Sequence, residues 1–264
     1  MIISPTPSGL SVVLQVDHQE QCAAAARAWG NSAFGRLDPW EPVVRAAALH
    51  DEGWRMWEAQ PEIDDRGRPI DFPHLDRGRH MALYRDGIAT AYTDGPLVGL
   101  LVSMHGEGLY RSRPGLDGPG GSGENLNDAG RAFADEQRDL QARTLSTLPA
   151  GPWAEWATRA HRLIQTWDAL SLYLTWRGLP DGRPGTLRAV PTGARGDYVE
   201  ITLTPRDGLT VECDPHPFAD VEVVLPVAIR VIGDRTYRSN VDLQRALATA
   251  PTETRHYRIV ASSR

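Results

Sequence analysis

The stretch Val43-Val-Arg-Ala-Ala-Ala-Leu-His-Asp-Glu-Gly-Trp54 ends an apolar helical run with an adjacent histidine and aspartate. The helix is predicted to begin at Asp38-Pro39, with the aspartate as its cap and the proline in its first turn. Neighbouring residues on a helix differ by about 100° in direction and about 1.5 Å in rise, and Gly53 lets the backbone turn away at once. The imidazole and the carboxylate of this pair can therefore converge on one metal ion.

Three further polar residues lie in otherwise apolar helical contexts. His18 stands at a predicted helix start, His105 follows the apolar run 97–104, and Asp168 lies within the apolar run 163–174. A carboxylate in such surroundings needs a compensating cation. Histidine and aspartate together suit Fe, Mn, Zn or Mg. We therefore expect one or two divalent transition-metal ions, with Fe or Mn favoured and Zn or Mg as alternatives. The expected ligands are His18, His50, Asp51, His105 and Asp168.

The hydrophobic period changes along the chain. Helical spacing dominates residues 1–178, apart from a predicted strand at 10–16 and a loop at 60–76. Residues 179–194 are rich in glycine and proline and are predicted to join two units. Alternation with a period of two then predicts a small α+β accessory module at 195–264. The expected fold is mainly α, a helical metal-binding bundle followed by this module.

Composition excludes several classes of protein. The chain has 264 residues, a formal net charge of −6 and no lysine among its basic residues. Schiff-base chemistry and a P-loop, which both need lysine, are therefore excluded. There is no basic block, so nucleic acid is not an expected partner. The expected partners are a small-molecule substrate and, as an option, a second copy of the chain in a homodimer.

Cysteine usage and hydropathy bear on the compartment. No apolar run approaches the roughly 20 residues that a membrane helix needs, so no membrane partner is expected. The first 16 residues lack the charged start and cleavage pattern of a signal peptide. Cys22 and Cys213 are far apart and form no CxxC pair. We expect two free thiols in a reducing cytoplasm.

The order of the predicted ligands resembles the HD-domain superfamily, which has a histidine, an adjacent His-Asp pair, further histidines and a late aspartate. More narrowly, nearly the whole chain resembles the bacterial domain-of-unknown-function family 3891. A single His-Asp pair would be weak evidence, whereas the ordered set with its flanks is far more specific. The stretches that carry the resemblance are Asp17-His18, Trp29-Gly30-Asn31, His50-Asp51-Glu52-Gly53-Trp54, Gly67-Arg68-Pro69-Ile70-Asp71-Phe72, Leu100-Leu-Val-Ser-Met-His105, Glu136-Gln-Arg138, Trp167-Asp168-Ala-Leu-Ser-Leu-Tyr173 and Asp214-Pro-His-Pro-Phe218.

The superfamily resemblance implies an HD-like, all-helical metal site, commonly used to hydrolyse phosphate esters. A minority of that superfamily are di-iron oxygenases. One departure matters, because the usual hydrolase signature continues with glycine and lysine after the His-Asp pair, and here Glu52-Gly53-Trp54 follows. The expected function is a metal-dependent hydrolase that uses a metal-activated water on a small-molecule ester or phosphoester. The alternatives are a di-iron oxygenase acting on a small molecule and a non-catalytic binding protein stabilised by its metal.

Other residues have both an active and a structural interpretation. Glu52 could serve as the general base for a metal-bound water or be a surface carboxylate. His105 could act on the substrate as an acid or base instead of binding metal. His74 and His80 could complete a second metal site or be solvated. The glycine-rich segment 112–123 is predicted to act as a lid or to be a linker.

Overall fold

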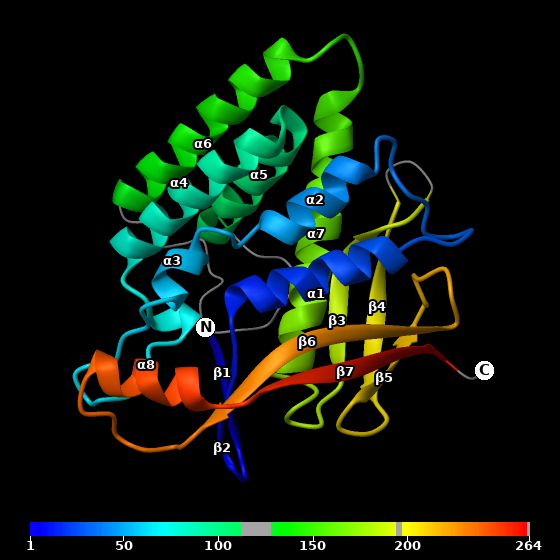
Figure 1. The fold of residues 1–264 in the computed structure, drawn as a ribbon. Helices are drawn as coiled ribbons and strands as arrows, with labels where there is room; N and C mark the ends of the chain where they lie inside the picture. The colour runs from blue at the N-terminus through cyan, green and yellow to red at the C-terminus, as the bar shows by residue number, and fades with distance from the viewer. Residues whose placement is uncertain (112–127, 194–196, 263–264) are drawn as a thin grey trace.

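The computed structural model describes residues 1–111, 128–193 and 197–262 (Figure 1). The helices are α1 (Gln15–Ala28), α2 (Glu41–Leu49), α3 (Trp54–Glu58), the short 3-10 helix η1 (Phe72–His74), α4 (Arg77–Asp94), α5 (Pro96–Arg111), α6 (Asp128–Thr147), α7 (Trp153–Thr175) and α8 (Asn240–Thr249). The strands are β1 (Ile2–Thr6), β2 (Gly9–Val13), β3 (Gly185–Pro191), β4 (Tyr198–Pro205), β5 (Thr210–Asp214), β6 (Glu222–Ile232) and β7 (Thr252–Ala261).

These seven strands form one mixed sheet in the order β1-β2-β6-β7-β5-β4-β3. Strands β5 and β7 run parallel, and every other neighbouring pair is antiparallel. Strand β2 pairs with β6 through Leu10 opposite Ile232 and Val12 opposite Arg230. The beginning and the end of the described chain therefore share one sheet.

The prediction of a mainly α fold is wrong, because a seven-stranded sheet lies beneath the helices and makes the fold α/β. The predicted strand at 10–16 is the second arm of a hairpin, and its first arm is β1. Strand β3 lies inside the segment 179–194 that is predicted to be a joint. Both additions are edge strands that pair only with the next strand along the chain, β2 and β4. Pro5 in β1 and the register shift between Leu187 and Val190 in β3 break the period of two that would mark a strand. The division into units at 1–178 and 195–264 stays a prediction.

The helices form two layers on the sheet. Helix α1 packs against β6 and α7 packs against β3, and the two helices also contact each other. Helices α2 and α5 pack on this inner pair, and α4 and α6 pack on α5 (Figure 1). Side chains of α1 and α7 that face α2 and α5 are thus enclosed between the layers.

One hydrophobic core runs from the helices into the sheet. It includes Trp29 and Trp167, whose rings meet edge to face at 5.7 Å between centroids, and Leu225 and Ile259 of the sheet. Such continuous burial is the main favourable term that holds the layers together.

Two helices begin away from their predicted starts. Helix α1 starts at Gln15 rather than at His18, and Leu14 at its cap position supplies no side-chain hydrogen bond. Helix α2 starts at Glu41 rather than after Asp38.

The predicted lid at 112–123 lies outside the described residues. Within the part of the chain that is described, no helix combines the length and the apolar character needed to cross a membrane.

Candidate metal centre

The five predicted ligands meet in the space enclosed by α1, α2, α5 and α7. His18 lies on α1, His50 caps the end of α2 and is followed by Asp51, His105 lies on α5, and Asp168 lies on α7. All five are buried, with between 1% and 6% of each residue exposed. The ring centroids of His50 lie 5.4 Å from His18 and 4.7 Å from His105. We call these five residues the histidine–aspartate cluster.

Potential donor atoms in the cluster lie close enough to share an ion. One donor atom from each of His50, Asp51 and His105 lies within 4.8 Å of the others. His18 Nε2 lies 3.2 Å from Asp168 Oδ1 and 4.0 Å from Asp51 Oδ2. This arrangement joins residues that are more than a hundred positions apart in the sequence.

The backbone fixes which nitrogen of His50 faces the cluster. Its Nδ1 lies 2.8 Å from the carbonyl oxygen of Ala47, which can only accept a hydrogen bond, so Nδ1 carries the proton. The other nitrogen, Nε2, is buried, makes no hydrogen bond and lies 3.6 Å from Asp51 Oδ2. A buried polar atom without a partner is costly, and a metal ion would satisfy this one.

A longer chain of hydrogen bonds fixes His18. Gln21 donates from its amide nitrogen to the carbonyl of Leu225 on β6, so its oxygen faces Ser171. The Ser171 hydroxyl donates to that oxygen at 2.6 Å and can therefore accept from His18 Nδ1 at 2.7 Å. His18 Nε2 is left facing the cluster.

His18 Nε2 faces the carboxylate of Asp168 at 3.2 Å. A proton or a cation has to lie between these two atoms, because both would otherwise present lone pairs to each other. Burial lowers the pKa of His18, whereas Cys22 and Asp168 raise it, and the net pKa lies well above the usual value. Burial also raises the pKa of the Cys22 thiol, which is therefore neutral near pH 7. Asp168 is thus the charge that keeps His18 protonated. A metal ion could replace that proton, with both side chains as ligands.

Asp51 accepts hydrogen bonds from two neutral donors and lies beside histidines of the cluster. Tyr84 donates its hydroxyl to Asp51 Oδ1 at 2.5 Å, and Gln15 donates its amide to Oδ2 at 3.1 Å. The Asp51 backbone N–H donates to Gln19 Oε1 at 3.0 Å. Burial raises the pKa of the Asp51 carboxyl, but the three neighbouring histidines outweigh burial and hold it below its usual value. Asp51 therefore presents a carboxylate to the cluster.

The other candidates have different surroundings. The carboxylate of Glu52 is bound by Arg55 and by Gln19. Burial raises the pKa of Glu52, but the hydrogen bonds from Arg55 and Gln19 lower it by more, so the net pKa lies below its usual value. Glu52 is therefore a weaker base than an ordinary glutamate. His74 is exposed and paired with Asp71. His80 Nδ1 lies 2.6 Å from the Tyr110 hydroxyl, and neither histidine belongs to a group of potential ligands found among the described residues.

Three residues of the site lie beyond what the sequence predicts. Cys22 is predicted only to be a free thiol, and Cys22 and Cys213 are indeed free and buried. Cys22 follows His18 by four residues, which puts the two side chains on one helix face. This spacing is a signal that could have revealed Cys22 as a site residue. Tyr84 and Ser171 carry no such signal, since each reaches the cluster only through tertiary packing.

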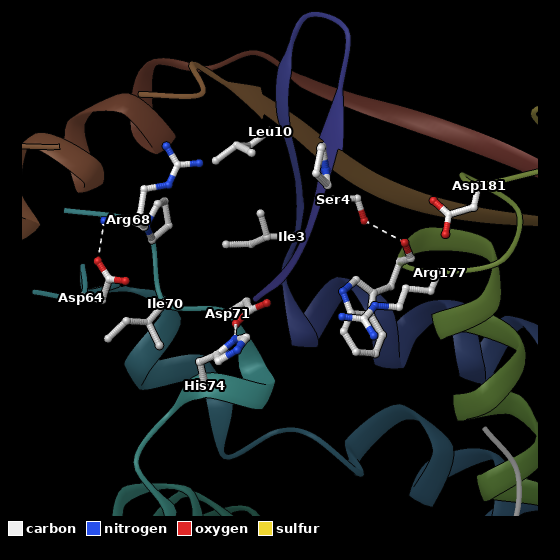
Figure 2. A pocket seen from close by; sticks show the side chains of 13 residues that line it. Ile3, Ser4, Leu10, Asp64, Arg68, Ile70, Asp71, His74, Arg177 and Asp181 are labelled. Atoms are coloured by element: carbon white, nitrogen blue, oxygen red, sulfur yellow. Dashed lines mark hydrogen bonds and ion pairs between the residues drawn. The ribbon is translucent and has the colours of Figure 1, made fainter. Parts of the chain in front are cut away.

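A separate cavity of about 670 Å³ lies on β1 near the end of α7. Figure 2 shows Arg68 and Arg177 on opposite sides of it with Ile3 between them. None of the histidine–aspartate cluster lines this cavity. Several of its charges are already paired, Arg68 with Asp234 and Asp71 with His74. The buried cluster, with its unpartnered nitrogen, is therefore the stronger candidate for chemistry.

Fold and site together define an α/β protein that encloses a cluster of histidine, aspartate and cysteine side chains among the helices that pack on its sheet. The chain belongs to the family DUF3891, described as "Protein of unknown function (DUF3891)", whose model matches residues 1–234. The match covers all five residues of the cluster and confirms the narrower of the two resemblances. It lends no support to the HD-domain resemblance. No curated protein and no solved structure matches the chain.

Proposed function

We propose that this protein is a metal-dependent hydrolase of small-molecule esters or phosphoesters, with its metal held by a ligand set of the HD type. The observation that carries the proposal is the buried Nε2 of His50, which has no hydrogen-bond partner and lies in a cluster of imidazole and carboxylate groups. Such a donor set is typical of Fe, Mn and Zn sites.

The residues present fit a divalent ion. His18 and His50 each bind an internal acceptor through Nδ1 and so present Nε2 to the cluster. Asp51 and Asp168 add carboxylates, which balance the charge of a cation in this enclosed space. When bound, the ion would act as a Lewis acid and lower the pKa of a coordinated water.

Proton transfer is assigned to His105. Its ring lies edge-on to His50 at 4.7 Å and near Tyr84, at 6.2 Å between centroids. Glu52 is the other candidate, but Arg55 and Gln19 stabilise its charged form. We therefore propose that His105 holds or delivers the proton during hydrolysis, and that Tyr84 orients the neighbouring Asp51.

The test is reconstitution of the metal-free protein with Mn²⁺ or with Fe²⁺, under nitrogen, followed by a screen of phosphate and carboxylate esters. Hydrolysis with Mn²⁺ in the absence of O₂ is expected, since the reaction needs no change of oxidation state. The matched variants are His50→Ala, expected to be inactive, and His161→Ala, which removes a histidine outside the cluster and is expected to retain activity.

Two results would overturn the hydrolase proposal. Turnover that depends strictly on iron and on O₂ uptake would favour the oxygenase alternative. Metal binding without any turnover in either screen would favour the non-catalytic binding protein.

A further inference from the structure

Cys22 gives the cluster a second group of potential ligands. One donor atom from each of His18, Cys22 and His50 lies within 4.8 Å of the others, and all three residues are buried. The Cys22 Sγ lies 3.9 Å from His18 Nε2. No water reaches this thiol, because Cys22 has no exposed surface. The group overlaps the group of His50, Asp51 and His105 at one residue.

Helix geometry directs Cys22 toward the cluster. His18 and Cys22 are four residues apart on α1, so they lie one above the other on the same face. That face is turned toward α7 and α2, where Asp168 and His50 lie. Cys22 is therefore held beside the cluster by the helix itself.

The two groups compete for the same nitrogen. His50 can bind an ion only through Nε2, because its Nδ1 is committed to Ala47. An ion bound to His50 can therefore take its further ligands either from the group with the Cys22 sulfur or from the group with the Asp51 oxygen. Soft thiolate donors favour Zn²⁺ and other late transition metals, whereas carboxylate oxygen suits Mn²⁺ and Mg²⁺.

We propose that Cys22 is a metal ligand, together with His18 and His50, and that it makes the site prefer Zn²⁺, Co²⁺ or Fe²⁺ to Mn²⁺ and Mg²⁺ at equal concentrations, so that Mn²⁺ fills the site when it is supplied alone. This inference rests on the proposed metal site and specifies its ligand set. Coordination forms a metal–sulfur bond in place of the S–H bond, and the released proton goes to the buffer. The independent observation that points to an ion at this position is His50 Nε2, which is buried, makes no hydrogen bond and has a carboxylate oxygen, Asp51 Oδ2, 3.6 Å away.

The test is Co²⁺ titration of the metal-free protein, followed by absorption spectroscopy. Visible ligand-field bands report Co²⁺ bound at the site, and a near-ultraviolet sulfur-to-cobalt charge-transfer band reports a thiolate ligand. Both are expected in the wild type and in Cys213→Ser, which removes the other thiol. Cys22→Ser is expected to keep the visible bands, to lose the near-ultraviolet band and to bind Zn²⁺ at least about tenfold more weakly.

The outcomes separate the two claims. Visible bands without the near-ultraviolet band in the wild type would overturn the role of Cys22 and leave the metal site standing. A near-ultraviolet band that persists in Cys22→Ser would likewise overturn the role of Cys22 alone. The absence of all cobalt bands in the wild type would overturn both claims. If Cys22→Ser fails to fold, the wild type and Cys213→Ser spectra still decide.

Discussion

At the scale of single residues, two imidazoles of the cluster are held by hydrogen bonds at the ring nitrogen that faces away from it. A histidine that ligates a metal usually donates its other ring nitrogen to a fixed acceptor. His50 uses the Ala47 carbonyl and His18 uses Ser171, which is itself oriented by Gln21 and by a carbonyl of β6. Three consecutive hydrogen bonds thus connect the backbone of β6 to the imidazole of His18.

The Ser171→Ala variant tests this chain of bonds. Removing the hydroxyl takes away the acceptor for His18 Nδ1, so the ring can rotate and metal affinity should fall by about 10–100-fold. Competition with a fluorescent zinc chelator measures the affinity. Ser4→Ala removes another buried serine, one that donates to the carbonyl of Thr175, and should leave the affinity unchanged. Equal affinities in all three proteins would contradict the role given to Ser171.

A second prediction concerns the bond between Tyr84 and Asp51. Tyr84→Phe leaves a buried carboxylate oxygen without this donor, so the metal-free protein should lose about 1.5–3 kcal/mol of unfolding free energy. Tyr92→Phe removes a hydroxyl bonded to neutral Thr144 and should cost only about 0.5–1.5 kcal/mol. Urea unfolding of both variants gives the comparison. A smaller loss for Tyr84→Phe than for Tyr92→Phe would show that Asp51 is not held as described.

At the scale of elements, the His-Asp pair depends on a close crossing between the α2–α3 turn and α4. A Cβ on Gly53 would lie 1.8 Å from the carbonyl oxygen of Leu83, and one on Gly87 would lie 2.8 Å from the Gly53 nitrogen. Gly53 has a helical φ of −58°, so its backbone freedom is not what the structure uses. The glycine is required because the backbone of α4 lies against it.

Gly53→Ala should therefore displace α4 from the end of α2. We expect a loss of at least about 3 kcal/mol in unfolding free energy, since backbone atoms must move. Gly208→Ala is the matched control, because no atom lies within 4 Å of its added Cβ, and it should change stability by less than about 0.5 kcal/mol. Similar unfolding midpoints for the two variants would contradict the close crossing.

The elements also show what the sequence could and could not predict. The pair at 50–51 and Asp168 are recognisable because charged or polar residues interrupt apolar helical runs. The helices themselves follow from their 3.6-residue period. Strands β1 and β3 escape prediction although each pairs with the next strand along the chain, because Pro5 and the register shift between Leu187 and Val190 interrupt the period of two. Ser171 escapes prediction as a site residue because its role depends on which helices face each other, whereas the spacing of four residues between His18 and Cys22 is a signal present in the sequence itself.

At the scale of the whole molecule, the sheet joins the two ends of the described chain. Strand β2 pairs with β6, and one hydrophobic core contains residues of the helices and of the sheet. Structural units that share a core tend to unfold together. The helices that carry the cluster and the sheet that orients His18 should therefore behave as one cooperative unit.

Two local probes can test this cooperativity. All eight tryptophans lie before residue 178 and report the helical part, whereas Cys213 is buried in β5 and reports the sheet. In the Cys22→Ser variant, tryptophan fluorescence and the labelling of Cys213 should give the same urea midpoint. Two separate midpoints would indicate that the segment from 195 onward folds as an independent module.

The measurement that bears most directly on the proposed metal site is the metal content of freshly purified protein, determined by elemental analysis. The cluster predicts at least one transition-metal ion per chain in the wild type and in His161→Ala. It predicts loss of that ion in the double variant His50→Ala, Asp51→Ala, which removes the unpartnered nitrogen and its neighbouring carboxylate. The same metal content in the wild type and in the folded double variant would contradict a metal site at this cluster.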